Sequence, residues 1–153
     1  LNGEFLWPNN YCLGEVECAL GVKLLDRVDQ LNQEKRQRAI GFIDALSDFP
    51  ELKFHCEDSK RHNYHLLVAQ MDNGRRDEFM KEMSEDKGIQ CVVQYNPLYR
   101  YDLYKKMGQG DASCANTDHF FDNMVSFPFH HMMTEDDFFY LLESTKEVLA
   151  QLR

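Results

Sequence analysis

The chain has 153 residues, enough for one domain that buries most of its apolar surface. Hydrophobic residues make up 43% and charged residues 28%, as in ordinary globular proteins. The formal net charge is −9, and the densest basic patch, residues 35–38, has acidic neighbours, which argues against a nucleic-acid surface. No apolar run approaches the roughly 20 residues that span a bilayer. We therefore expect neither nucleic acid nor membrane as a partner.

The cysteines indicate a reducing environment. There are five, an odd number without paired short spacings, which argues against a disulfide framework. Cys18, Cys56 and Cys91 fall at apolar positions of periodic segments, where a free thiol acts as a small hydrophobe. A cytoplasmic location fits this pattern best.

The first third of the chain predicts a lead-in segment and helices. Residues 1–12 form an extended lead-in with turn formers at residues 8–10. A helix should follow to about Leu31, because apolar residues recur on one face at Leu13, Val16, Leu20 and Leu24. A polar stretch, 32–38, separates it from a second helical segment that starts at Ala39 and is ended by Pro50.

The rest of the chain mixes strand and helix patterns. We expect strands over 52–56, 63–71 and 89–95, the second covered on both faces and containing a buried His65 bonded to backbone carbonyls. Helices are expected over 75–87, 115–124 and 134–152, with a short aromatic helix or turn over 99–107 and a loop over 108–111. Residues 134–137 are close to a capping box. The predicted fold class is α+β, a small, mostly antiparallel sheet of about three strands with helices packed on it.

Three short motifs carry a family resemblance. They are the Asn10-Tyr11 turn, the segment Gln94-Tyr95-Asn96-Pro97-Leu98, and the turn Ser126-Phe127-Pro128-Phe129-His130. In this order and spacing they resemble the C-terminal part of the DegT/DnrJ/StrS family, pyridoxal-phosphate (PLP) sugar aminotransferases. The resemblance runs over nearly the whole chain, and its specificity comes from the succession of weak motifs.

The resemblance implies roles for particular residues. Asn10, with Tyr11 beside it, would contact the PLP phosphate of the neighbouring subunit, although Cys12 stands where the family usually has arginine. Gln94, Tyr95 and Tyr99 would form a wall for the sugar, with Gln94 and Tyr99 in place of the family's histidines. The alternative for Asn10 is a turn residue that stabilises its own backbone, and for the later segment a rigid turn whose tyrosines pack on the next helix.

His130 follows the Phe-Pro-Phe turn, where the family often has a histidine that would contact substrate. A buried histidine satisfied by backbone carbonyls is the alternative. The chain supplies no catalytic residue in this reading.

The resemblance also implies a larger enzyme. Residues 13–153 would be the small C-terminal domain of a fold-type-I PLP aminotransferase, after the lead-in 1–12. The large N-terminal domain, which carries the Schiff-base lysine in the family, would be missing, so this chain alone should be inactive. The whole protein would be a homodimer that transfers an amino group, from glutamate or a similar donor, to a keto-sugar carried on a phosphate or a nucleotide. Within the family the chain looks nearest to enzymes that aminate a 3-keto hexose phosphate in amino-sugar antibiotic pathways such as kanosamine's.

Other functions are weaker readings of the sequence. Lys60 follows Ser59, but its charged neighbours indicate a solvated turn. Cys56, His62 and His65 lie close in sequence, but no second pair of ligands completes a zinc tetrahedron, so no metal site is predicted. The rivals are a non-enzymatic α+β interaction module and a small sugar-binding protein that uses the tyrosines of residues 95–104.

Overall fold

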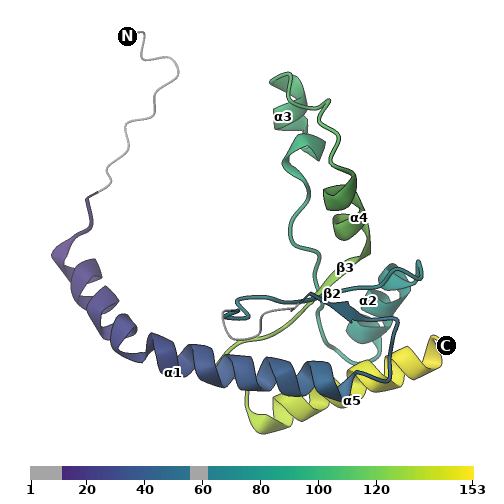
Figure 1. The fold of residues 1–153 in the computed structure, drawn as a ribbon, viewed down its shortest axis with the longest axis horizontal. Coiled ribbons are helices and arrows are strands. Elements are labelled where there is room, and N and C mark those ends of the chain that lie inside the picture. The colour runs from purple at the N-terminus through teal and green to yellow at the C-terminus, as the bar shows by residue number, and fades with distance from the viewer. Residues whose placement is uncertain (1–11, 56–61) are drawn as a thin grey trace.

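A computed structural model describes residues 12–55 and 62–153 (Figure 1). The helices are α1 (Glu15–Ala45), α2 (Arg76–Glu85), the 3-10 helix η2 (Leu98–Arg100), α3 (Asp102–Lys106), α4 (Ala115–Asn123) and α5 (Glu135–Gln151). The strands are β1 (Lys53–Phe54), β2 (Leu67–Gln70) and β3 (Met124–Phe127). Asn10 and Tyr11 lie outside the described residues, as do Cys56 and Lys60.

The three strands form one antiparallel sheet in the order β1-β2-β3, with Phe54 opposite Ala69 and Leu67 opposite Phe127. The predicted α+β class is therefore confirmed. The prediction of a third strand over 89–95 was wrong, because β3 takes that place in the sheet. Residues 89–95 touch β3 through a single bridge between Val92 and Ser126. All four residues of β3 are buried, the polar Ser126 among them, and the run is too short to stand out between a helix and a proline turn.

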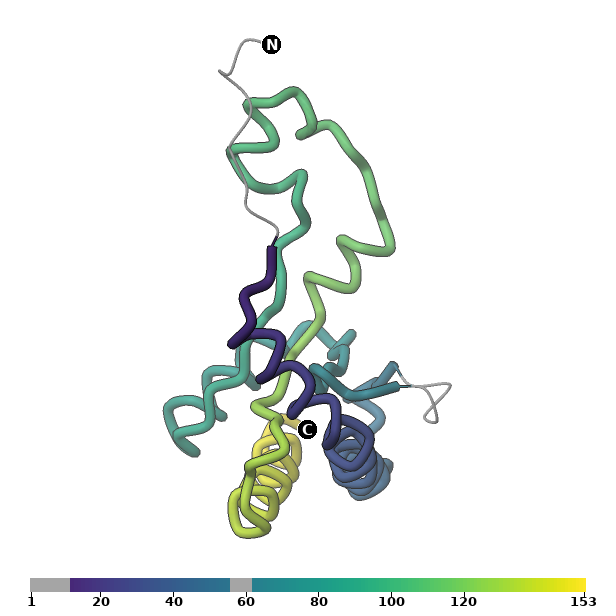
Figure 2. Tube along the Cα trace, turned by 90° about the vertical axis from the view of Figure 1, so that its left-hand side faces the viewer, coloured from purple at the N-terminus to yellow at the C-terminus, as the bar shows by residue number. Residues whose placement is uncertain are grey.

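The chain divides into a compact body and a projecting arm. In the body, α1 and α5 lie side by side beneath the sheet, with α2 beside α5, and the end-on view of Figure 2 shows the same pairing. The arm, residues 94–123, contains η2, α3 and α4 and rises from the other side of the sheet (Figure 1). The first half of α1 extends away from both.

The core of the body is built around Phe42 of α1, which is fully buried. Its ring meets those of Phe127 and Phe138 edge-on, with centroids 5.3 and 6.1 Å away. Phe79 from α2 adds a further edge-on contact to Phe127 at 6.1 Å. Such pairs are favoured beyond the apolar area that they bury. One aromatic cluster thus joins α1, α2, α5 and β3.

The predicted break in the first helix was wrong: α1 is continuous over 31 residues. Its polar stretch consists largely of straight-chain residues that favour helix. Two of them also hold loops of the body. The Arg36 Nε donates to the carbonyl of His62 at 3.2 Å, and the Arg38 Nη1 donates to the carbonyl of Met133 at 2.6 Å. The stretch therefore ties α1 to the body.

Most remaining local predictions are confirmed. Residues 72–74 form a turn in which Gly74 has a φ of +75°, and Gly88, with a φ of +65°, follows the end of α2. Helix α5 begins with a capping box in which the Thr134 hydroxyl accepts from the Asp137 N–H at 3.1 Å. The prediction of a buried His65 was wrong, since its side chain is exposed at the sheet's edge.

Within residues 12–55 and 62–153, no helix combines the length and the apolar character needed to cross a membrane. Helix α1 is long enough but too polar.

Candidate functional site

The segment that begins the arm carries two of the predicted substrate-binding residues. Gln94 is half-buried, and its side-chain Oε1 is enclosed without a hydrogen-bond partner among the described residues. Tyr95 follows across a cis peptide bond and is 74% exposed. A buried amide oxygen without a partner is unfavourable unless a ligand or water donates to it. Gln94 thus offers an acceptor beside an exposed aromatic ring.

A cavity of about 440 Å³ opens on the arm beside Tyr95, the residue after Gln94. Its wall is almost entirely apolar and is formed by Tyr95, Leu98, Tyr101, Leu103 and Tyr104, with Asn96 as the one amide. Aromatic faces of this kind can stack on the apolar face of a sugar ring, while amides bond to its hydroxyl groups. The wall is thus suited to a polar ring with one apolar face.

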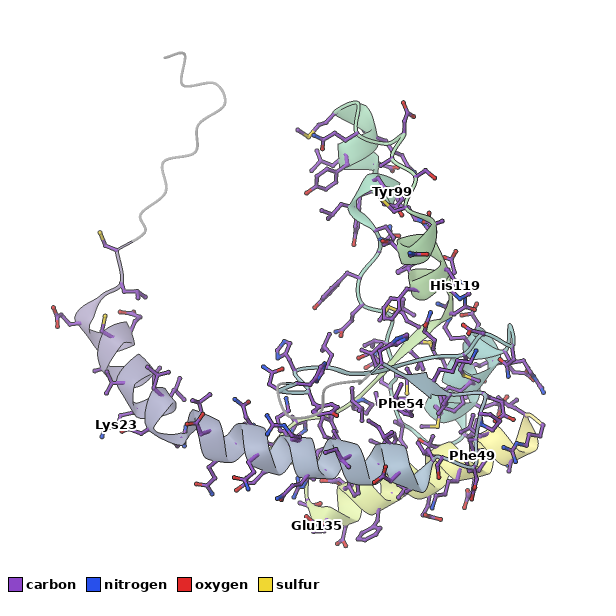
Figure 3. All side chains as sticks on the ribbon, in the orientation of Figure 1. Lys23, Phe49, Phe54, Tyr99, His119 and Glu135 are labelled. Atoms are coloured by element: carbon purple, nitrogen blue, oxygen red, sulfur yellow. The ribbon has the colours of Figure 1, made fainter. Side chains whose placement is uncertain are left out.

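Tyr99, the third predicted wall residue, points into the arm instead. Its hydroxyl donates to the carboxylate of Asp118 on α4 at 2.9 Å. Figure 3 shows Tyr99 in the arm, above His119. Its role in the structure is to join the two limbs of the arm, so that the neighbouring wall segment is held against α4.

Arg100 completes this joint. Its guanidinium donates to both Asp118 and Asp122, the latter at 2.7 and 3.2 Å, and lies 5.2 Å from the centroid of the Phe121 ring. A planar guanidinium can serve two carboxylates and an aromatic face at once, which an ammonium cannot. No sequence pattern predicts this cluster, because Arg100 and its two carboxylate partners are 18 and 22 residues apart.

The cluster shifts the titration of its members. Hydrogen bonding to Arg100 lowers the pKa of Asp122, while bonding to both carboxylates raises the pKa of Arg100. The pKa of the Tyr99 phenol is raised by burial and then by its bond to Asp118. The joint therefore keeps Tyr99 neutral, Asp122 ionised and Arg100 charged through the neutral pH range.

His130 is not brought together with Gln94 and Tyr95. Val92 pairs with Ser126 in antiparallel sense, so residues after 92 run toward Met124 while residues after 126 run the opposite way. His130 is exposed and lies beyond the other end of that pair. It belongs to the turn before α5, where Lys35 of α1 lies 5.9 Å from the ring centroid of Phe129.

The described residues do not fit a complete PLP site. A lysine that forms an imine with the cofactor is expected in an enclosed, polar pocket. None of the described lysines lines any of the four main cavities. Lys35 alone among them has a lowered pKa, through partial burial, and it packs toward an aromatic ring on the body. Nor do the described residues contain a group of three histidine, cysteine or acidic side chains placed to hold a metal.

Sequence comparison identifies relatives of the chain. Residues 5–146 match the DegT/DnrJ/EryC1/StrS aminotransferase family. The UDP-4-amino-4,6-dideoxy-N-acetyl-β-L-altrosamine transaminase of Campylobacter jejuni is 31% identical over 149 residues, which are 94% of this chain and 39% of that protein. The spore coat polysaccharide biosynthesis protein SpsC of Bacillus subtilis is 24% identical, over 88% of this chain and 36% of that protein. The chain thus spans about two fifths of the length of the curated relatives that it matches.

Solved structures agree on the fold. The Helicobacter pylori PseC aminotransferase, involved in pseudaminic acid biosynthesis, superposes with a TM-score of 0.82 at 21% identity, over 94% of this chain and 39% of that one. The sugar aminotransferase Spr1654 of Streptococcus pneumoniae, solved in a PLP form, gives a TM-score of 0.74 at 20% identity, over 92% of this chain and 37% of that one. The PLP expected from the sequence is thus the cofactor of a solved relative.

Proposed function

The chain belongs to the DegT/DnrJ/EryC1/StrS aminotransferase family, and we propose that it is the smaller lobe of a PLP-dependent enzyme that transfers an amino group to a nucleotide-linked keto-sugar. The observation that carries this proposal is the 31% identity, over 94% of the chain, to a transaminase named for a UDP-linked amino sugar. That relative favours a nucleotide carrier over the sugar phosphate that the sequence also allowed. Glutamate is the proposed amino donor.

In this proposal the arm is the substrate wall. The Gln94 Oε1 accepts a hydrogen bond from a sugar hydroxyl, which satisfies its buried oxygen, and Tyr95 covers the sugar ring. The Arg100 joint, with Tyr99, holds that segment in place. Fixing a wall before substrate arrives lowers the entropic cost of orienting the sugar. His130 lies beyond the other end of the Val92–Ser126 pair and is not part of this wall.

The cofactor would be held mainly by a large domain outside the described residues. The partial coverage of the relatives supports that division, since the chain matches 39% of the Campylobacter jejuni transaminase. Asn10 and Tyr11 are proposed to reach the PLP phosphate of the neighbouring subunit. They are outside the described residues, so their role rests on the sequence motif alone.

The large domain and a second subunit are the proposed partners of the exposed half of α1. Val16 and Leu20 of this half are 77% and 59% exposed, and Leu13, two residues before the helix begins, is 77% exposed. An exposed apolar stripe of this kind is typical of a surface that another protein part covers. A homodimer with active sites between its subunits accords with this stripe.

The test is an assay of the full-length protein. With glutamate and a UDP-linked 4-keto-6-deoxyhexose, we expect amino-sugar product and a PLP absorbance band. The Gln94→Leu variant should keep the band but raise KM for the sugar, and the Asn10→Ala variant should lose PLP on dialysis. The matched control, Gln109→Leu on the exposed loop of the arm, should change neither.

Two outcomes contradict the proposal. If the 153-residue chain forms the aminated product by itself, the reactive lysine lies within it and the division into lobes is wrong. If the full-length protein neither binds PLP nor aminates a keto-sugar, the chain serves as a binding or interaction module.

A further inference from the structure

A second cavity lies at the base of the arm, away from the tyrosine wall. Its volume is about 310 Å³, at the lower end of the roughly 300–1,000 Å³ of small-molecule pockets. Three elements enclose it: the end of α1 with Ile43, the edge of the sheet with Phe54, and α4 with Phe120. Phe120 lies near the end of α4, where the arm returns to the body, and the proposed sugar wall begins at residues 94–95, where the arm leaves it.

Imidazole rings and one amide supply the polar part of its wall. His55, His62 and His65 line it, with Asn63 between the latter two. No carboxylate is among the described residues that line it. The cavity therefore combines apolar side chains with groups that can donate hydrogen bonds to acceptors on a ring.

Backbone contacts set which atoms of these groups remain for a ligand. The Tyr64 N–H donates to the His62 Nδ1 at 2.9 Å. An accepting Nδ1 carries no proton, so the ring proton is on Nε2, which is a donor. The His65 N–H donates to the Asn63 Oδ1 at 3.1 Å, which leaves the Asn63 amide nitrogen as a second donor.

The conformation of this corner is maintained at a cost. Tyr64 has a φ of +48°, in the left-handed region that non-glycine residues rarely adopt, although its side chain is only 1% exposed. Its ring contacts the His62 ring with centroids 4.4 Å apart. Backbone conformations of this kind are found at sites where side chains must keep one orientation. Here the strained residue is Tyr64, and its backbone and ring contacts fix the orientation of the His62 ring.

The aromatic part of the cavity fits a flat ring. Phe54 and Phe120 both line it, and His55 packs against Phe120 with centroids 5.2 Å apart. Aromatic side chains stack on nucleobases with a contribution that every base can provide through its π face. Donors beside stacking rings then select a base that carries carbonyl acceptors.

From these features we propose that the cavity binds the pyrimidine ring of the nucleotide that carries the sugar. The inference rests on the proposed function, which makes the substrate a nucleotide-linked sugar. The base stacks between Phe54 and Phe120, and its carbonyl oxygens accept from the His62 Nε2 and the Asn63 amide. The sugar end of the same molecule then extends toward Gln94 and Tyr95 at the base of the arm.

Titration of the ¹⁵N-labelled 153-residue chain with uridine tests this assignment. We expect shifts of the backbone amides of residues 63–68 and 120, with weaker binding of cytidine, which has an amino group in place of one carbonyl. Asn63→Asp keeps the oxygen that caps His65 but loses the donor, and it should weaken uridine binding roughly tenfold. Phe120→Leu should also weaken it. The control Asn116→Asp, on the exposed start of α4, should leave it unchanged.

Three results would overturn the assignment: no shifts with uridine, equal affinity for uridine and cytidine, or shifts with inorganic diphosphate in place of uridine. Its failure is separable from that of the proposed function. Amination of a UDP-sugar by full-length Asn63→Asp at unchanged KM removes the base site and leaves the aminotransferase. Uridine binding without any amination keeps the site and removes the aminotransferase.

Discussion

The two halves of α1 belong to one helix but meet different surroundings. In the second half, Ala39 and Phe42 are fully buried between the sheet and α5. In the first half no residue is buried, although its apolar side chains recur as regularly, and Val16 is 77% exposed. Periodicity thus marks both halves as interfaces, while only one interface is completed within the described residues. Helical periodicity records that a face is covered but not by what.

The arm and the body differ in the same way, because one has a buried apolar core and the other does not. The body has a contiguous apolar core, whereas α3, α4 and η2 contain no buried residue. The arm is held by polar contacts, chiefly the Arg100 joint, and its exposed tyrosines face outward. A region that gains little from its own apolar burial is stabilised by what it binds.

The largest effect should come from a cavity in the body. Phe42→Ala removes the ring that contacts Phe127 and Phe138, and should lower the free energy of unfolding by about 3–5 kcal/mol. The matched change in the exposed half, Leu20→Ala, should alter it by less than about 0.5 kcal/mol. Urea unfolding followed by circular dichroism measures both. Similar losses in the two variants would mean that the halves of α1 are equally packed in the isolated chain.

The next effect is a pH dependence carried by Cys91 of the body. Burial raises the pKa of this thiol from 9.0 to about 12. The folded state therefore keeps the thiol neutral while the unfolded chain ionises, so stability is complete below pH 9 and falls as pH rises above it. At pH 10 the loss should be about 1.4 kcal/mol. Cys91→Ala should show a flatter profile between pH 8 and 10, and an unchanged slope would assign the pH dependence to other groups.

Most of the body, which these two predictions concern, could be predicted from the sequence. Its helices could be predicted because periodic apolar positions and turn residues such as Gly88 act locally. The boundary between β3 and α4 could not, since Met124 continues an apolar pattern without a break and the ladder to β2 pairs residues that are 54 to 60 positions apart. His65 was expected inside the sheet because alternation cannot show that β2 begins only at Leu67.

The candidate site was predictable only in part. The tyrosine-rich segment stands out by composition, and Tyr95 does line a cavity, while the Gln94 Oε1 is buried without a partner among the described residues. The contacts of Tyr99 and Arg100 with Asp118 could not be predicted, because side chains 18 or 19 residues apart follow no helix or strand periodicity. The histidine cavity was visible only as a doubtful metal motif. Its actual order comes from two backbone hydrogen bonds that no spacing reveals.

A smaller effect is expected at the start of α5. Thr134→Ala removes the hydroxyl that accepts from the Asp137 N–H and should cost about 1 kcal/mol. Thr134→Ser, which keeps the hydroxyl, is the control. Hydrogen bonds from Thr134 lower the pKa of Asp137, so this stabilisation is present above pH 3.8 and is lost as pH falls through the lowered pKa. The difference in free energy of unfolding between the two variants should therefore shrink below the pKa of Asp137. A difference that stays constant would mean that the Asp137 carboxylate does not take part in the cap.

The smallest effect on global stability should come from Arg100→Ala. This variant also gives the most direct test of whether the arm and the body are stabilised separately. The change frees Asp118 and Asp122 and removes the charge from the Phe121 ring, but it touches nothing in the aromatic cluster of the body. Hydrogen exchange should therefore rise across residues 94–123 and stay unchanged in α5 and β2. Lys23→Ala, an exposed change on the first half of α1, is the control. If exchange rises equally in arm and body, the two unfold as one cooperative unit. The proposal that ligand binding stabilises the arm separately from the body is then wrong. If it rises only in the arm, substrate should restore the protection, because binding would supply the order that the joint no longer does.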